Sequence, residues 1–164
     1  MNDSEQKDSI EELVDYMVLE DNNFPFDFSF RLIDDRYPES THQCLNFPGI
    51  FVKPLETEVF TDDGINLRMD AAHLVLPDDT IPQKSAEGIE HQSNRLDFKK
   101  IDAIYDYKVG LIHNNNLPAI SVVVTNIDYE LSEIIFESHG DAFKIYFKIL
   151  DDDEIYERLN TLKI

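Results

Sequence analysis

The spacing of hydrophobic and polar positions changes along the 164-residue chain, and each pattern predicts a different element. A capping box at Ser9–Glu12 comes before apolar residues at helical spacing, which predicts a helix over about Ser9–Leu19. Between Asp21 and Pro48 the pattern is irregular, with clustered aromatic residues and prolines. We therefore expect a loop-rich segment there, with room for one short helix.

The middle of the chain predicts strands. Phe51–Phe60 is rich in strand formers, and Asp62–Gly64 is a hairpin turn signal. A long alternating strand, Ile65–Leu76, follows it. The breaker cluster Pro77–Pro82 separates this strand from a returning strand, Ser85–Ser93.

The last third of the chain alternates between helical and strand patterns. A helix is expected over about Asn94–His113, from its polar cap and its apolar stripe. Ala119–Thr125 is an almost continuous β-branched run, which predicts a strand buried on both faces and paired in parallel. Ser132–Glu137 and Phe143–Leu150 predict further strands, and Asp151–Leu162 predicts a closing helix.

This order of elements predicts a mixed α/β fold with a central sheet flanked by helices. Residues 49–164 would form the α/β core, and residues 1–48 an N-terminal helix and loop-rich segment of the same compact domain. Apolar residues make up 42% of the chain, which excludes wholesale disorder. The single cysteine, Cys44, excludes an internal disulfide and a multi-cysteine zinc site.

The charge balance is strongly acidic, with 14 Lys and Arg against 34 Asp and Glu, a net charge of −20. The overall field of such a chain should attract neither nucleic acid nor an anionic membrane. Met1–Glu20 lacks the pattern of a secretory signal, and the apolar stretches are too short to span a bilayer. We therefore expect a soluble cytoplasmic protein. Residues 84–108 differ from the rest, because five bases balance five acids there.

The turn centred near Thr80 brings two acidic residues together. If the hairpin is symmetric there, residues whose numbers sum to twice 80 lie opposite one another, so Asp70 faces Glu90 and Arg68 faces Gln92. Two carboxylates with Cβ atoms roughly 5 Å apart repel each other unless a cation lies between them. Mg²⁺ suits such a pair because it prefers oxygen ligands, and Mn²⁺ is the alternative.

Three segments carry a resemblance to a known family: Asp70 in LRMDAAHLV, Glu90 and Gln92 in GIEHQS, and the following helix and strand ending in PAISVVVT. Together they resemble the PD-(D/E)xK nuclease superfamily, and within it the recombination-promoting nuclease/putative transposase family, whose motif ends in Glu-x-Gln. The resemblance covers roughly Glu56–Thr125. It implies a restriction-endonuclease-like three-layer core and a Mg²⁺-dependent endonuclease, a phosphodiesterase whose partner is DNA.

The resemblance also implies roles for single residues. Asp70 would be the acidic metal ligand on the second core strand and Glu90 its partner on the third, with the backbone carbonyl of His91 completing the site. Gln92 stands where the superfamily usually has Lys, which stabilises developing phosphate charge and helps to activate water. Gln donates a hydrogen bond but carries no charge, so this electrostatic stabilisation is weaker.

Other residues are auxiliary candidates. Lys100, on one flank of the predicted helix, would reach the phosphate, and Arg68 would supply positive charge from the hairpin. Glu11 or Glu12 would match the superfamily's helix carboxylate, and the sequence does not choose between them. His73 falls on the apolar side of its strand, where a structural role is expected.

Other interpretations stay open. Asp70 and Glu90 can be solvent-facing charges on an edge hairpin. The net charge of −20 and the missing Lys favour a catalytically inactive nuclease-like scaffold that serves as an acidic protein-interaction module, because DNA affinity rests mainly on phosphate neutralisation. A weaker alternative is an acidic surface that imitates DNA. The sequence does not decide whether the chain binds a protein partner or forms a homodimer.

Overall fold

The computed structural model describes residues 26–61, 63–150, 153–154 and 157–158. The predicted helix Ser9–Leu19 lies outside these residues, and within the predicted helix Asp151–Leu162 the described residues are helical. The elements are α2 (Phe26–Arg36), α3 (Pro38–Cys44), β1 (Ile50–Pro54), β2 (Glu58–Phe60), β3 (Asn66–Arg68), β4 (Ala71–Leu76), β5 (Ser85–Gln92), α4 (Phe98–Asn115), β6 (Ala119–Thr125), β7 (Glu133–Ser138) and β8 (Asp141–Ile149).

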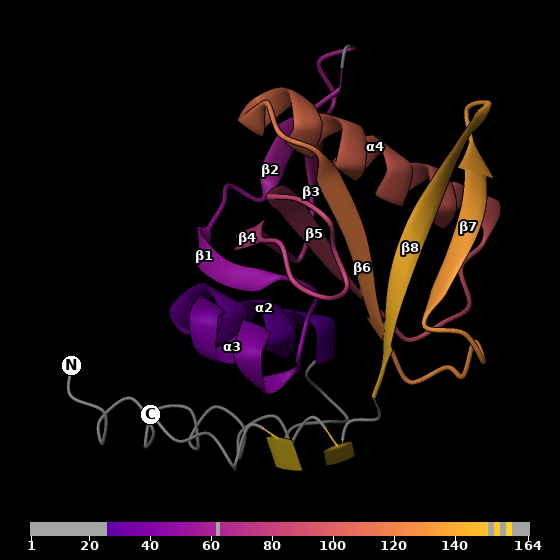
Figure 1. Cartoon of the computed structure of the whole chain (residues 1–164). Coiled ribbons are helices and arrows are strands. Elements are labelled where there is room, and N and C mark those ends of the chain that lie inside the picture. The colour runs from indigo at the N-terminus through magenta and orange to yellow at the C-terminus, as the bar shows by residue number, and fades with distance from the viewer. Residues whose placement is uncertain (1–25, 62, 151–152, 155–156, 159–164) are drawn as a thin grey trace.

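Six strands form one mixed sheet in the order β1-β4-β5-β6-β8-β7 (Figure 1). The strands β1, β4 and β5 pair antiparallel, whereas β6 pairs in parallel with both β5 and β8. Almost every residue of β6 is buried. The predicted mixed α/β class is confirmed, and so is the buried parallel strand at Ala119–Thr125.

Helices cover both faces of this sheet (Figure 1). α2 and α3 pack on one face, in a core that includes Ala71, Ile89 and Val124. α4 packs on the other face, in cores that include Ala72 and Val123. Because successive side chains of a strand point to opposite faces, the central strands supply both cores.

The hairpin of β4 and β5 has the predicted register. Ala71 pairs with Ile89 and His73 pairs with Glu87, and the two numbers of each pair sum to twice 80. The turn between these strands is held by Asp78, whose carboxylate accepts hydrogen bonds from three backbone N–H groups. The predicted centre of the turn was therefore correct.

The predicted strand Ile65–Leu76 is divided into two. β3 ends at Arg68 and pairs with β2, where Arg68 is the partner of Glu58, and β4 begins at Ala71. The chain bends between them because the β2–β3 hairpin forms its own sheet and packs against α4. The expected pairing of Arg68 with Gln92 is therefore wrong.

The segment from Asp21 to Pro48 was also predicted wrongly, because its described part forms two helices rather than loops. Phe30, Ile33 and Tyr37 recur at helical spacing and are buried. Pro38 lies in the first turn of α3, where its missing N–H removes no helical hydrogen bond. Burial of this apolar stripe against the sheet stabilises both helices.

α4 begins later than predicted. Asp97, rather than Asn94, is its N-cap, and the carboxylate of Asp97 accepts the backbone N–H of Lys100 at 2.8 Å.

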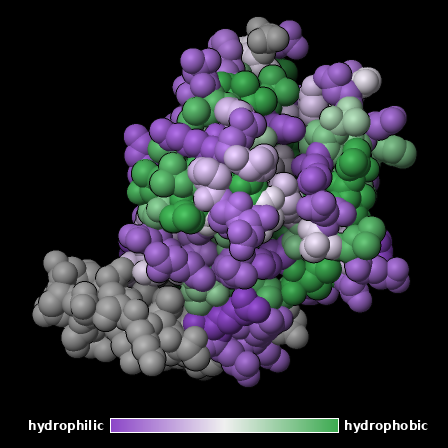
Figure 2. All heavy atoms as spheres, in the orientation of Figure 1, coloured by the Kyte–Doolittle hydropathy of each residue, from purple (hydrophilic) through white to green (hydrophobic). Residues whose placement is uncertain are grey.

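Hydrophilic side chains cover much of the face shown in Figure 2, and hydrophobic ones form separate patches. Exposed hydrophobic residues include Ile50 and Val52 on β1 and Ile135 on β7, the two edge strands of the sheet. In the part of the chain that the structure describes, no helix is long and apolar enough to cross a membrane.

Gly110 of α4 lets the helix lie directly on the β2–β3 hairpin. A Cβ atom at position 110 would lie 2.6 Å from Cβ of Val59, which is fully buried. We expect Gly110→Ala to lower the free energy of unfolding by about 1–3 kcal/mol, because overpacking outweighs the gain in helix propensity. Urea denaturation measures this loss, with Val109→Ala at a neighbouring exposed position as the control. Wild-type stability of Gly110→Ala would contradict the close packing.

Candidate functional site

Asp70 and Glu90 meet where β4 begins and β5 ends. Asp70 directly precedes β4, and the hairpin register places it opposite Glu90 of β5. The backbone N–H of Asp70 donates to Oε1 of Glu90 at 3.1 Å. Asp70 is only 3% exposed and Glu90 5%, so the interpretation of solvent-facing charges on an edge hairpin is wrong.

The carboxylate of Asp70 is held from two sides. Its Oδ2 accepts the backbone N–H of His91 at 2.8 Å. Its Oδ1 accepts a hydrogen bond from Nε of Arg31, a residue of α2, at 2.5 Å. Arg31 was missed from the sequence because it belongs to the segment that was expected to be loop-rich, and its contact with Asp70 spans 39 positions.

The side chain of Glu90 lies beside the ammonium group of Lys100 and near the carboxylate of Asp70. Nζ of Lys100, from α4, lies 3.5 Å from Oε2 of Glu90. The pKa of Glu90 is raised to about 8, first by burial and then by the charge of Asp70, while Lys100 and the hydrogen bond from Asp70 act in the opposite direction. At neutral pH, most molecules without a bound metal therefore keep a proton on Glu90.

Tyr107 of α4 lies beside this pair. Its pKa is raised to about 12, first by burial and then by the charges of Glu90 and Asp70. Nζ of Lys100 lies 5.9 Å from the centre of the Tyr107 ring. The ring stays a neutral phenol at physiological pH, and so adds a hydrogen-bond donor but no charge to the site.

Some of the other predicted residues lie near Asp70 and Glu90 in the structure, and others do not. Gln92 is half-buried at the end of β5, on the same face as the buried glutamate two positions earlier. His91 brings its backbone to the site through its N–H, and the role of its carbonyl as a ligand stays a prediction. Arg68 is exposed on the separate hairpin. Glu11 and Glu12 lie outside the described residues.

The chemistry of these donors fits a hard divalent cation. Both side-chain donors of the pair are carboxylate oxygens, which Mg²⁺ and Mn²⁺ prefer. Although Arg31 and Lys100 lower it, the pKa of Glu90 stays well above its ordinary value. Burial and the charge of Asp70 thus disfavour the ionised form of Glu90, and a cation bound by both carboxyl groups would favour it.

We compared the chain with protein-family models, with curated proteins and with solved structures, and none of them matches it.

Proposed function

We propose that this protein is a divalent-metal-dependent phosphodiesterase that cleaves DNA. The observation that carries the proposal is the meeting of two buried carboxylates, Asp70 and Glu90, at one end of a central hairpin, with Lys100 beside them. The resemblance to the PD-(D/E)xK superfamily supports it, and so does the order of β1, β4, β5, α4 and β6. A restriction-endonuclease-like core is part of the same proposal.

In this proposal Asp70 and Glu90 are the negatively charged ligands of Mg²⁺ or Mn²⁺, together with the carbonyl of His91. When bound, the ion stabilises negative charge on the scissile phosphate and lowers the pKa of a water ligand. Glu90 loses its proton in order to act as a ligand. Lys100 holds its ammonium at the edge of the site, and this charge takes the role that the neutral Gln92 leaves unfilled.

A catalytically inactive scaffold that binds a protein partner through its acidic surface is the second candidate. The ion pair between Arg31 and Asp70 favours it, because this contact neutralises a carboxylate that the enzyme needs as a ligand. The net charge of −20 favours it as well, since it opposes the approach of DNA.

Cleavage of supercoiled plasmid in Mg²⁺ or Mn²⁺ separates the two candidates. We expect the wild type to cut, and Asp70→Asn to abolish cleavage, because the amide keeps the shape of the side chain but loses the charge that binds the metal. Asp79→Asn, an exposed residue of the turn, is the matched control and should cut like the wild type. If the wild type cuts neither plasmid nor single-stranded DNA with either ion, the enzyme is excluded and the interaction module stands.

A further inference from the structure

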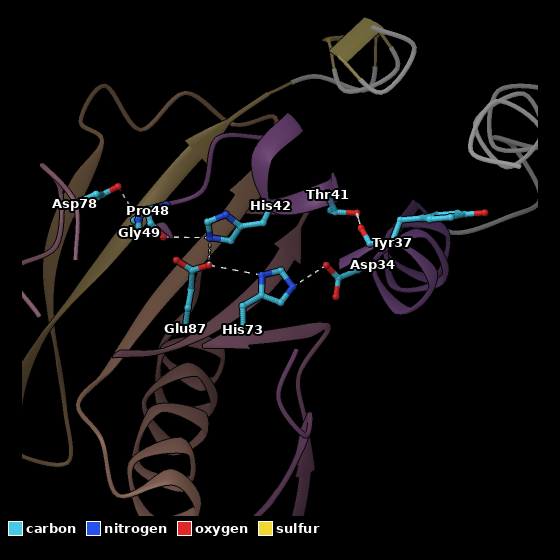
Figure 3. Close-up of polar contacts among 9 residues, drawn as sticks. All are labelled: Asp34, Tyr37, Thr41, His42, Pro48, Gly49, His73, Asp78 and Glu87. Carbon is cyan, nitrogen blue, oxygen red and sulfur yellow. Dashed lines mark hydrogen bonds and ion pairs between the residues drawn. The ribbon is translucent and has the colours of Figure 1, made fainter. Parts of the chain in front are cut away.

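A second polar cluster lies on the opposite face of the β4–β5 hairpin, under α2 and α3 (Figure 3). His73 and Glu87 are direct cross-strand partners, so their side chains point to the same face of the sheet. His42 reaches them from α3, and Asp34 from α2. His42 is 2% exposed, His73 and Glu87 are 0% exposed, and Asp34 is 5% exposed. Four ionisable side chains are thus enclosed together, away from the carboxylate pair of the proposed nuclease site.

The contact with Asp34 decides which nitrogen of His73 carries the proton. Nε2 of His73 lies 2.9 Å from Oδ1 of Asp34, which as a carboxylate only accepts hydrogen bonds. Nε2 is therefore the protonated nitrogen, and in the neutral ring Nδ1 presents a lone pair. This lone pair faces Oε1 of Glu87 at 3.8 Å. Unless Glu87 carries a proton, two acceptors face each other with no donor between them.

The orphaned atoms make this arrangement unusual for a buried site. Among the described residues, Nδ1 of His73 and both carboxylate oxygens of Glu87 are buried without a hydrogen-bond partner. Nε2 of His42 lies 3.0 Å from Oε1 of Glu87. The contact of Nε2 that has the geometry of a hydrogen bond is the one with the carbonyl oxygen of Pro48, at 3.2 Å. A cation between these atoms would satisfy all of them.

Two of the three spacings among these ligand atoms are near those of a tetrahedral metal ion. Zinc bonds of about 2.0–2.1 Å place tetrahedral ligand atoms roughly 3.3 Å apart. One ligand atom each from His42, His73 and Glu87 lies within 4.8 Å of the other two, and the pairs that involve Oε1 of Glu87 are 3.0 and 3.8 Å. The Pro48 carbonyl lies beside His42 as a candidate for the fourth position.

We propose that His42, His73 and Glu87 bind one Zn²⁺ ion in a closed structural site. Two imidazoles and one carboxylate are typical zinc ligands, whereas Mg²⁺ prefers oxygen alone. Asp34 is the positioning residue, because a carboxylate on the second ring nitrogen fixes the tautomer and the orientation of a ligating histidine. The two charges of the ion would balance the carboxylates of Glu87 and Asp34. The ion would fasten α3 to the β4–β5 hairpin.

The first test measures zinc in the full chain. The purified protein, stripped of metal by a chelator, should take up one equivalent of Zn²⁺ in a calorimetric titration and melt at a higher temperature once loaded. Excess Mg²⁺ should not displace the zinc. Co²⁺ should give the visible absorption bands of a tetrahedral site, which report ligand geometry independently of stability. If the wild type takes up no zinc, the proposal is overturned and the cluster shares a proton instead.

Variants then locate the ion. We expect Glu87→Gln to lower zinc affinity by more than 100-fold, and Asp34→Asn, which leaves the ligands intact, by about 10- to 100-fold. His113→Gln, which changes an exposed histidine, is the control and should bind zinc like the wild type. If Glu87→Gln does not fold, the zinc affinity of Asp34→Asn and the cobalt spectrum of the wild type still test whether the ion lies in this cluster. Wild-type affinity in Asp34→Asn, together with an octahedral cobalt spectrum, would place the ion on the acidic surface and overturn the proposal.

Discussion

Glu90→Gln is expected to stabilise the protein strongly above pH 8 and to leave its stability almost unchanged near pH 4.5. Glu90 has a pKa of about 8 in the native state, because it is buried beside Asp70, against an ordinary value of 4.5 when unfolded. Between these two values the native state binds more protons than the unfolded state, so the free energy of unfolding falls as the pH rises. Glutamine resembles the protonated side chain and cannot ionise, so the variant escapes this loss.

The size of the stabilisation by Glu90→Gln follows from the difference between the native and unfolded pKa values of Glu90. Each unit of difference in pKa corresponds to about 1.4 kcal/mol, so the advantage of Glu90→Gln should reach on the order of 3–5 kcal/mol above pH 8. Urea denaturation at several pH values, without added Mg²⁺, measures it. Glu137→Gln, at an exposed position of β7, is the control and should show no such trend. An advantage of Glu90→Gln that does not vary with pH would contradict the raised pKa.

Glu90→Gln is also expected to lose the thermal stabilisation that Mg²⁺ gives the wild type. If Glu90 is a metal ligand, Mg²⁺ at roughly 100 times its dissociation constant should stabilise the wild type by about 2.7 kcal/mol. Because Glu90 must first lose its proton, this affinity should fall about tenfold for each unit of pH below 8. Thermal shifts should be absent in Glu90→Gln and in Asp70→Asn. Shifts that persist in both variants would show that the ion binds elsewhere on the acidic surface.

The central hairpin could be predicted from the sequence because local signals define it. The breaker cluster Pro77–Pro82 fixes the turn, and the turn fixes the register that brings Asp70 opposite Glu90. The same arithmetic pairs His73 with Glu87, so half of the second polar cluster was already available from the sequence. It was overlooked because His73 was interpreted as one more position on the apolar side of its strand.

The two helices before the sheet could not be recognised in the same way. Their buried stripe contains Asp34 and His42, so polar residues interrupt the apolar period that usually reveals a helix. These residues are buried because they meet His73 and Glu87, and that contact depends on tertiary packing. Arg31 was missed for the same reason. Buried polar side chains therefore obscured the helical pattern in this segment.

The contact between Lys100 and Glu90 changes what is expected of Gln92. From sequence alone, Gln92→Lys would be expected to leave cleavage intact or to improve it by supplying the superfamily's missing charge. The structure already places the ammonium of Lys100 3.5 Å from Oε2 of Glu90. An added lysine at position 92 should therefore change the cleavage rate little. Arg68→Ala should have no effect, since that exposed side chain belongs to the β2–β3 hairpin.

Lys100→Ala is expected to lower the rate of DNA cleavage by about 100- to 1,000-fold, which is the usual cost of losing one well-placed electrostatic donor. Rates are compared at saturating Mg²⁺, so that weaker metal binding does not contribute. Lys99→Ala, which removes an exposed neighbouring charge, is the matched control and should affect mainly the salt dependence of DNA binding. Gln92→Lys should restore part of the rate in the Lys100→Ala background, because both side chains approach the same end of β5. Equal losses in Lys99→Ala and Lys100→Ala would mean that Lys100 only attracts DNA, and the charge beside the phosphate would then have to come from Arg31.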